Sequence, residues 1–351
     1  MLTMSENPGF TPSSLYASAE YGRAVAEEEG GSWEMIHDSN GNWQLPLVLR
    51  HIPQTPFLDA ATPYGYGGLH IGEDLSEAEA AACWRETTAI LRSRGVVSVF
   101  LRFPPFLPHQ AERASTLEGL KVLHVSRTIL VPTAAAETMW NAMGRSSRGK
   151  IRVAQKAGCS VEVVAASPAA IGEARALYEQ TMDRVGAAPY YYFSDNYYSN
   201  LSQLADRLHI ARVVDSTGTC VSASFVLSDA EFAHYHLSGS SGKISGVVNL
   251  LLWGVFQWAE EAGLKAVHLG GGLTDGDSLY KFKASLGGHA ETFSLGRSIL
   301  SEDVYETLVA QHANELGVSP AELKESSFFP AYRVAAPPGG PRQDTDDSSA
   351  S

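Results

Sequence analysis

The chain has 351 residues, a formal net charge of −13 and an apolar content of 44%. This length favours two domains over one, and the apolar content is ordinary for a globular protein. The acidity excludes a nucleic-acid binder that acts through its overall charge, so a polyanion would need a local basic patch. The three cysteines lie far apart and form no CxxC pair, which argues against a disulfide framework and a zinc site.

No apolar run reaches the roughly 20 residues that a membrane-spanning helix needs. The N-terminal sequence lacks the basic, apolar and small-residue regions of a signal peptide. We therefore predict a cytoplasmic protein that does not insert into a membrane.

The first part of the chain, from about residue 10 to residue 156, has the pattern of an α/β unit. Ser76 and Glu79 form a capping box that opens a helix running to about residue 92. A stiff loop of aromatic residues and glycines occupies residues 62–68. Strands are expected at residues 33–36, 43–51, 96–103 and 122–131.

A basic patch follows at residues 138–161, which contain no acidic residue. A helix from residue 135 is expected to break at Gly144, and Ser147 is expected to cap a second helix that ends at Gly158. Positive charge in the first turn of that second helix opposes the helix dipole, so we predict an anionic ligand, with a solvated helix face as the alternative. The cations that form one stripe along it are Arg145, Arg148, Arg152 and Lys156.

The second part, residues 161–300, repeats the α/β pattern. Strands are expected at residues 161–164, 210–215, 221–228, 231–238, 266–269 and 290–300, and helices at 167–185, 195–207 and 247–262. Strand 231–238, a Gly/Ser-rich loop, helix 247–262 and strand 266–269 form a βαβ pattern, which binds ligands at the carboxyl ends of strands. A short helix from Asp277 carries Lys281 and Lys283.

Two glycine-rich loops in this βαβ segment are candidate anion sites. The loop at residues 239–246 fails the P-loop pattern, and Gly270–Gly272 fails the dinucleotide fingerprint. Backbone N–H groups in either loop are expected to hold an oxyanion or a phosphate, unless the loops are only tight turns. A segment with six aromatic residues at 190–198 either stacks on a sugar, base or peptide or packs against its flanking helix.

We divide the chain into an N-terminal unit at residues 1–157 and a C-terminal unit at residues 158–300. Residues 301–335 are expected to form a helical extension that packs back on these units. Residues 336–351 consist mainly of Pro, Gly, Ser and Asp and are expected to be a disordered tail.

Six segments, taken in their order and spacing, form a pattern of a known family. They are TPYGYGG at 62–68, SSRGKIRVAQK at 146–156, YHLSG at 235–239, NLL at 249–251, HLGGG at 268–272 and DSLYKFK at 277–283. The pattern resembles the Fem family of peptidoglycan-bridge aminoacyltransferases and their relatives in the GNAT acyltransferase superfamily. The resemblance covers about residues 10–310.

The resemblance implies an α/β fold of two tandem GNAT-like units, each with a mixed central sheet flanked by helices. It implies transfer of an activated acyl group from charged tRNA onto an amine of a peptide, peptidoglycan precursor or amino sugar, without a permanently bound cofactor. The lysine of the family's Phe-Lys pair contacts an anionic part of a substrate, and it corresponds to Lys283 here. The chain lacks the helical arm with which many Fem proteins bind tRNA, which favours smaller relatives that modify peptides or sugars.

Acylation of an amine requires loss of the amine proton, donors for the oxyanion and two substrates held in line. We predict His236 as the proton acceptor, with Asp277 as the second choice, and Lys283 as a catalytic residue. His268 is expected to be structural. The predicted substrate-binding residues are Tyr64, Tyr66, Arg102, Arg148, Arg152, Tyr235, Asn249, Gly270, Gly271, Gly272 and Lys281.

Two other functions fit the sequence. An acyl-CoA-dependent GNAT enzyme would use the loop at residues 239–246 for the CoA pyrophosphate, although the glycine spacing departs from the usual form of that loop. The second alternative is a binding protein without catalytic activity.

Overall fold

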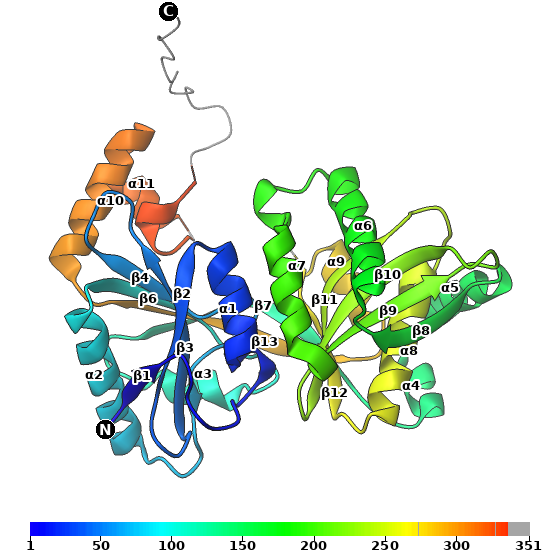
Figure 1. Cartoon of the computed structure of the whole chain (residues 1–351), viewed down its shortest axis with the longest axis horizontal. Coiled ribbons are helices and arrows are strands. Elements are labelled where there is room, and N and C mark those ends of the chain that lie inside the picture. Colours follow the sequence, from blue (N-terminus) through cyan, green and yellow to red (C-terminus); the bar gives the residue numbers. More distant parts are fainter. Residues whose placement is uncertain (273, 327, 336–351) are drawn as a thin grey trace, which may run out of the picture.

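The computed structural model describes residues 1–272, 274–326 and 328–335, so the tail predicted at 336–351 lies outside the described residues. The strands of the described residues form one continuous mixed sheet of 13 strands. The sheet has two halves that lie side by side, with helices on their faces (Figure 1). Four short 3₁₀ helices occupy Leu15–Ala17, Pro189–Tyr191, Ser202–Arg207 and Ala331–Arg333.

The first half begins with an antiparallel meander. Helix α2 starts at the expected capping box, in which Ser76 and Glu79 each bond the other's backbone N–H. Trp43 and Trp84 fill the core between the sheet and this helix. The strands are β1 (Thr3–Ser5), β2 (Gly31–His37), β3 (Trp43–His51), β4 (Leu58–Ala61), β5 (His70–Ile71) and β6 (Val96–Arg102), and the helices are α1 (Ala19–Glu28), α2 (Glu77–Ser93) and α3 (His109–Ala114).

The second half is built around an apolar helix, α8, whose buried residues pack against the sheet. Its strands are β7 (Lys121–Pro132), β8 (Ser160–Ala165), β9 (Leu208–Val214), β10 (Cys220–Ser228), β11 (Phe232–Ser240), β12 (Ala266–Gly270) and β13 (His289–Ile299). Its helices are α4 (Ala136–Ala142), α5 (Arg145–Lys156), α6 (Pro168–Val185), α7 (Asp195–Leu201), α8 (Val247–Glu261) and α9 (Ser278–Ala284).

The strand order is β1-β2-β3-β4-β6-β13-β7-β12-β11-β10-β9-β8, with β5 on β3. Each half contains a parallel pair joined through a helix, β4–α2–β6 in the first and β11–α8–β12 in the second. β7 pairs with β12, β13 pairs with β6, and β7 and β13 pair with each other, so the halves exchange strands. Figure 1 shows β7 and β13 running between the halves. The predicted fold of two tandem GNAT-like units is confirmed.

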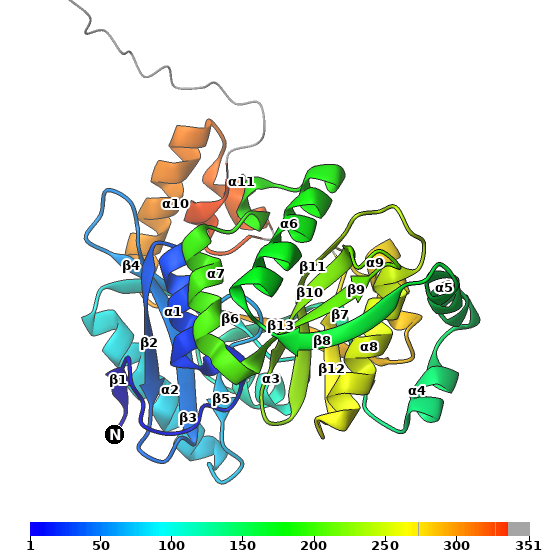
Figure 2. The same cartoon turned by 45° about the vertical axis from the view of Figure 1, so that its right-hand side comes forward.

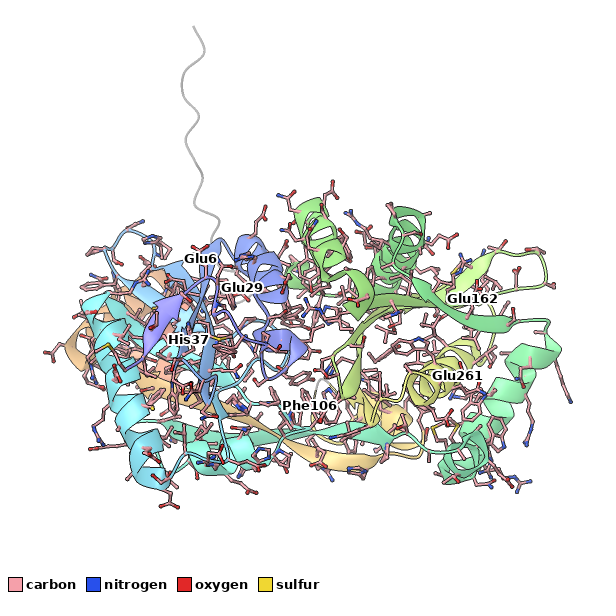
Figure 3. All side chains as sticks on the ribbon, turned by 60° about the horizontal axis from the view of Figure 1, so that its bottom comes forward. Glu6, Glu29, His37, Phe106, Glu162 and Glu261 are labelled. Atoms are coloured by element: carbon pink, nitrogen blue, oxygen red, sulfur yellow. The ribbon has the colours of Figure 1, made fainter. Side chains whose placement is uncertain are left out.

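The core between the halves joins side chains from both. Helix α1 of the first half packs against α7 of the second half, as Figures 1 and 2 both show. Phe106, which lies between the halves in Figure 3, places its ring centroid 5.0 Å from that of Phe232 on β11. The boundary predicted at residue 157 stays a prediction, although α5, which precedes it, packs against α8.

The C-terminal extension packs on the first half. Helices α10 (Glu302–Leu316) and α11 (Pro320–Glu325) share a buried cluster with Ile52 and Val97. Asp59, which is 1% exposed, forms ion pairs with Arg50 of the first half and Arg333 of the extension. None of the helices in the described part of the chain combines the length and the apolarity that a bilayer crossing requires.

The start of α5 corrects one expectation. The N-cap residue is Gly144, and Ser147 lies inside the helix, where its hydroxyl is 2.8 Å from the hydroxyl of Ser285. The backbone N–H of Gly144 donates to the carbonyl of Ser285, which fixes the start of the helix three residues before the expected cap. Helices α1 and α3 are further elements that the sequence patterns did not indicate.

Candidate functional site

The site lies where two parallel strands separate. β11 and β12 pair from Phe232 and Ala266 to His234 and His268 only, although β11 continues to Ser240. Beyond His268 the register of β12 against β7 also shifts. Where the pairing of β11 with β12 ends, a gap opens in the sheet. Helix α9 contacts the neighbouring strand β7.

A β-bulge in β11 turns two consecutive side chains toward the gap. Ser224 and Val226 of β10 face Ser238 and Tyr235 of β11, so β11 carries one extra residue in this stretch. A bulge of this kind interrupts the strict alternation of strand side chains. Tyr235 and His236, which are adjacent in β11, therefore both line the same cavity.

This cavity, which we name the central cavity, has a volume of about 330 Å³ and is lined by both halves. Tyr16, Tyr191 and Phe293 also line it, and the sequence patterns did not single out Tyr16 or Phe293. Tyr191 belongs to the aromatic segment whose role was left open. The predicted site residues that the fold brings together here are Tyr64, Tyr66, Arg102, Tyr235, His236, Gly270, Gly271, Gly272 and Lys283.

Lys283 is the buried cation of the central cavity. Its side chain is 8% exposed, and Nζ donates a hydrogen bond of 2.7 Å to the carbonyl of Gly271. Burial lowers the pKa of Lys283 to about 8, and the nearby carboxylate of Asp277 opposes the shift. A lysine with such a pKa is partly neutral near pH 7, so it is able to accept a proton as well as to attract an anion.

The glycine run lets the backbone approach these groups closely. Gly270 has a φ of +70°, and a Cβ there would lie 3.3 Å from the Tyr66 hydroxyl and 3.4 Å from the Lys283 amine. A Cβ at Gly271 would lie 2.7 Å from the carbonyl oxygen of Arg127. The run is therefore required by the packing of β12 against β7 and by the shape of the cavity.

The two predicted proton acceptors differ in position. His236 lies 2.8 Å from the Tyr197 hydroxyl through Nε2, and burial together with His234 lowers the pKa of His236 to about 3. Asp277 caps α9, where its carboxylate accepts from the backbone N–H groups of Tyr280 and of residue 274, and it is absent from the described lining of the cavity. A neutral His236 is a weak base at pH 7.

A second cavity of about 300 Å³, the helix-end cavity, lies at the start of α8. Asn249 lines it, is 3% exposed, and has an amide nitrogen, Nδ2, with no partner among the described residues. α8 has no side-chain cap, so its first N–H groups are available to a ligand. Lys150 and Phe282 line the cavity, and Lys283, the neighbour of Phe282 on α9, lines the central cavity.

The other predicted cations lie outside both cavities. The Arg148 guanidinium donates to three backbone carbonyls at the end of α4. Arg152 lies over the ring of Trp140 at 5.2 Å. Lys281 is exposed on α9. Within the described residues, none of these three lines the central or the helix-end cavity, whereas Lys150, a basic-patch residue not predicted as a site residue, does line the latter.

Comparisons with known proteins bear on this geometry. Residues 143–284 match the family described as "Acetyltransferase (GNAT) domain". A search of curated proteins found no match. Among solved structures, FemX is similar with a TM-score of 0.69 and 14% identity, over 86% of this chain and 96% of FemX.

Two further solved structures are similar over most of their length. L-PGS from Bacillus licheniformis has a TM-score of 0.54 and 15% identity, over 82% of this chain and 94% of that chain. A conserved protein of unknown function from Bacteroides thetaiotaomicron has a TM-score of 0.58 and 11% identity, over 85% of this chain and 100% of that chain. At such identities the likeness concerns the fold.

The matched segment contains part of the lining of both cavities. Residues 143–284 include β11 and β12, between which the gap in the sheet lies, and α8. They also include α5 with Lys150 and α9 with Lys283. The chain has a fold similar to that of FemX, and residues 143–284, mostly in its second half, match a GNAT acetyltransferase domain.

Proposed function

We propose that the protein transfers an aminoacyl group from charged tRNA onto a primary amine held in the central cavity. The acceptor is a small peptide, a cell-wall precursor or an amino sugar. The observation that supports this best is the pair of cavities to which α9 contributes lining residues, near the gap between β11 and β12. Donor and acceptor would approach the gap from opposite sides and meet beside Lys283.

The acceptor amine must lose a proton before it attacks the donor ester. The new C–N bond forms as the ester C–O bond breaks, and the ribose hydroxyl of the donor leaves with a proton. Lys283, with a pKa of about 8, is better matched to an ammonium group than His236, with a pKa of about 3. We therefore assign the proton acceptor to Lys283 and the positioning of the substrate to His236 and Tyr235.

Charge on the donor side favours a long polyanion. Residues 138–161 carry no acid, and none of the basic side chains exposed on α5 forms an ion pair within the described residues. This face adjoins the helix-end cavity through Lys150. Such a face suits phosphate groups along an RNA strand, although the net charge of the protein is negative. The exposed cations are Arg145, Lys150, Arg152 and Lys156.

The second candidate is an acyl-CoA-dependent N-acyltransferase. The family match to an acetyltransferase domain favours it, as does the uncapped start of α8 beside Lys150, which suits a pyrophosphate. The backbone of α5 packs tightly here, because a Cβ at Gly246 would lie 2.1 Å from the carbonyl oxygen of Lys150. The space for a pyrophosphate beside the loop at residues 239–246 is therefore limited.

Donor substitution distinguishes the two. The purified protein is incubated with a mixture of amine acceptors and either radiolabelled aminoacyl-tRNA or radiolabelled acetyl-CoA, each with and without ribonuclease. Label transfer from aminoacyl-tRNA that ribonuclease abolishes supports the proposal, and ribonuclease-resistant transfer from acetyl-CoA alone supports the second candidate. Lys283→Met is the inactive control in both arms.

A further inference from the structure

We propose that Arg102 selects acceptor amines that carry a carboxylate or a phosphate, by holding that anion in the central cavity. This inference rests on the proposed function, since it names the class of acceptor that the same cavity takes. It assigns the anion to a residue of the first half, whereas Lys283, which faces the same cavity, belongs to the second half.

The charge of the central cavity is one-sided. Arg102 and Lys283 both line it, and no Asp or Glu occurs among its described lining residues. His236 contributes no charge near pH 7, because its pKa is about 3. A protein with a net charge of −13 thus has a cavity whose described lining contains two basic residues and no acidic one. Such a cavity attracts an anion and repels an amine whose positive charge has no counter-charge of its own.

Arg102 has unused donors. Its Nη1 donates 2.8 Å to the carbonyl of Thr62, and its guanidinium carbon lies 4.8 Å from the centre of the Phe100 ring. Nε and Nη2 have no hydrogen-bond partner among the described residues. The contacts to Thr62 and Phe100 fix the plane of the guanidinium, and a fixed guanidinium edge with free N–H groups matches two oxygens of a carboxylate or phosphate.

Among the described residues, no carboxylate forms an ion pair with the Arg102 guanidinium. Glu29, labelled in Figure 3 at the end of α1, is the acid that most favours the charged form of Arg102. Glu29 is itself paired with Arg50 at 3.0 Å, and Arg50 also pairs with Asp59 at 2.9 Å. Burial lowers the pKa of Arg102, which means that burial disfavours the charged guanidinium. A bound anion would offset this unfavourable free energy.

The test uses two pairs of amines that differ in the anion only. Alanine is compared with alaninamide, and glucosamine 6-phosphate with glucosamine. Binding to the full chain is measured by saturation-transfer NMR in a low-salt chloride buffer without any acyl donor, so the result does not depend on transfer activity. We expect at least ten-fold tighter binding of one or both members that carry the anion over the partners that lack it. The pair that shows the preference identifies carboxylate or phosphate as the anion.

Arg102→Met should abolish this preference, and Arg102→Lys should retain part of it. Arg85→Met removes an exposed positive charge from α2 and should leave the preference unchanged. Circular dichroism checks that each variant is folded, and Arg102→Lys decides the outcome if Arg102→Met is not. Equal binding within both pairs, no binding of either anionic amine up to 0.1 M, or an unchanged preference in the Arg102 variants would overturn the inference. Transfer without anion selectivity would overturn it and leave the proposed function intact.

Discussion

At the scale of single residues, the site depends on a lysine held away from water. The Lys283 amine donates to the Gly271 carbonyl, and a second basic residue, Arg102, lines the same cavity. Its depressed pKa means that the folded state disfavours the charged form. Stability should therefore be lower below pH 8 and should rise between pH 8 and the pKa of the unfolded chain, because the unfolded state binds the proton more strongly in that interval.

Lys283→Met should remove activity and raise stability at pH 7. A shift of this size corresponds to about 3 kcal/mol of unfavourable burial, from which about 1 kcal/mol is subtracted for the lost hydrogen bond to Gly271. Urea unfolding at pH 7 and pH 10 measures both effects, and the advantage of the variant should shrink at pH 10. Lys281→Met, an exposed change on the same helix, should alter stability little. Equal destabilisation by both substitutions would contradict this account of Lys283.

The pH dependence of transfer should report Lys283 and not His236. If neutral Lys283 accepts the proton, kcat/KM should rise with pH and level off above about pH 8. His236→Asn should lower the rate without moving this midpoint, because the His236 ring is already neutral throughout the range. A midpoint near pH 6 that disappears in His236→Asn would instead assign the proton acceptor to His236.

At the scale of elements, the start of α8 is the second determinant. Asn249 places an amide nitrogen that has no partner among the described residues in the buried first turn of α8, and such a group costs about 1–3 kcal/mol when buried. Asn249→Leu should therefore keep or raise stability while it raises the KM for the donor. Gln257→Leu, a half-buried change two turns further along α8, should leave that KM unchanged. Thermal unfolding and donor titrations measure the two effects, and an unchanged KM in Asn249→Leu would exclude the helix-end cavity as the donor site.

Two glycines that flank α8 form a matched pair. Gly246 and Gly263 have similar φ values of +86° and +73°, but a Cβ would meet Lys150 at 2.1 Å at the first and open space at the second. Gly263→Ala should lower the free energy of unfolding by about 1 kcal/mol, because alanine disfavours the left-handed backbone conformation that this position requires. Gly246→Ala should cost clearly more, because α5 must also move away from α8. Chemical denaturation of both variants tests this, and equal losses would mean that α5 yields freely.

The elements of the second half were largely predictable from local signals. Helices α6 and α8 agree with the helices expected at residues 167–185 and 247–262, and Ser167 caps α6. The bulge at His236 was not predictable, since it depends on the register of β11 against a distant strand. For the same reason the sequence could not place Arg148, because its use as a cap for α4 depends on how α4 and α5 meet.

The sequence predicted most of the residues that line the central cavity, but it did not predict which of the remaining candidates lie near them. Nine of the predicted residues line the central cavity, because motifs at strand ends converge in an α/β fold. Of the cations on α5, Lys150 lines the helix-end cavity, whereas Arg148 and Arg152, which were predicted to bind substrate, line neither cavity. A stripe on a helix fixes which residues share a face, but not which neighbour that face meets.

At the scale of the whole molecule, one sheet and one central core join the halves. We expect a single cooperative unfolding transition. Asp59→Asn, which leaves Arg50 and Arg333 with a neutral partner in place of a buried carboxylate, should lower stability by about 3 kcal/mol or more. Tryptophan fluorescence and far-UV circular dichroism should give the same lowered midpoint. Separate midpoints for the two probes would show that the halves unfold independently.

The strand exchange between β7 and β13 also limits how the enzyme can move. Domains joined by a flexible linker can close on a substrate by a hinge motion. In this protein such a motion would have to break backbone hydrogen bonds of β7 and β13. The width of the crevice is therefore set when the chain folds. Substrates must be admitted by rearrangement of side chains and loops at its rim, so turnover should require no large-scale closure.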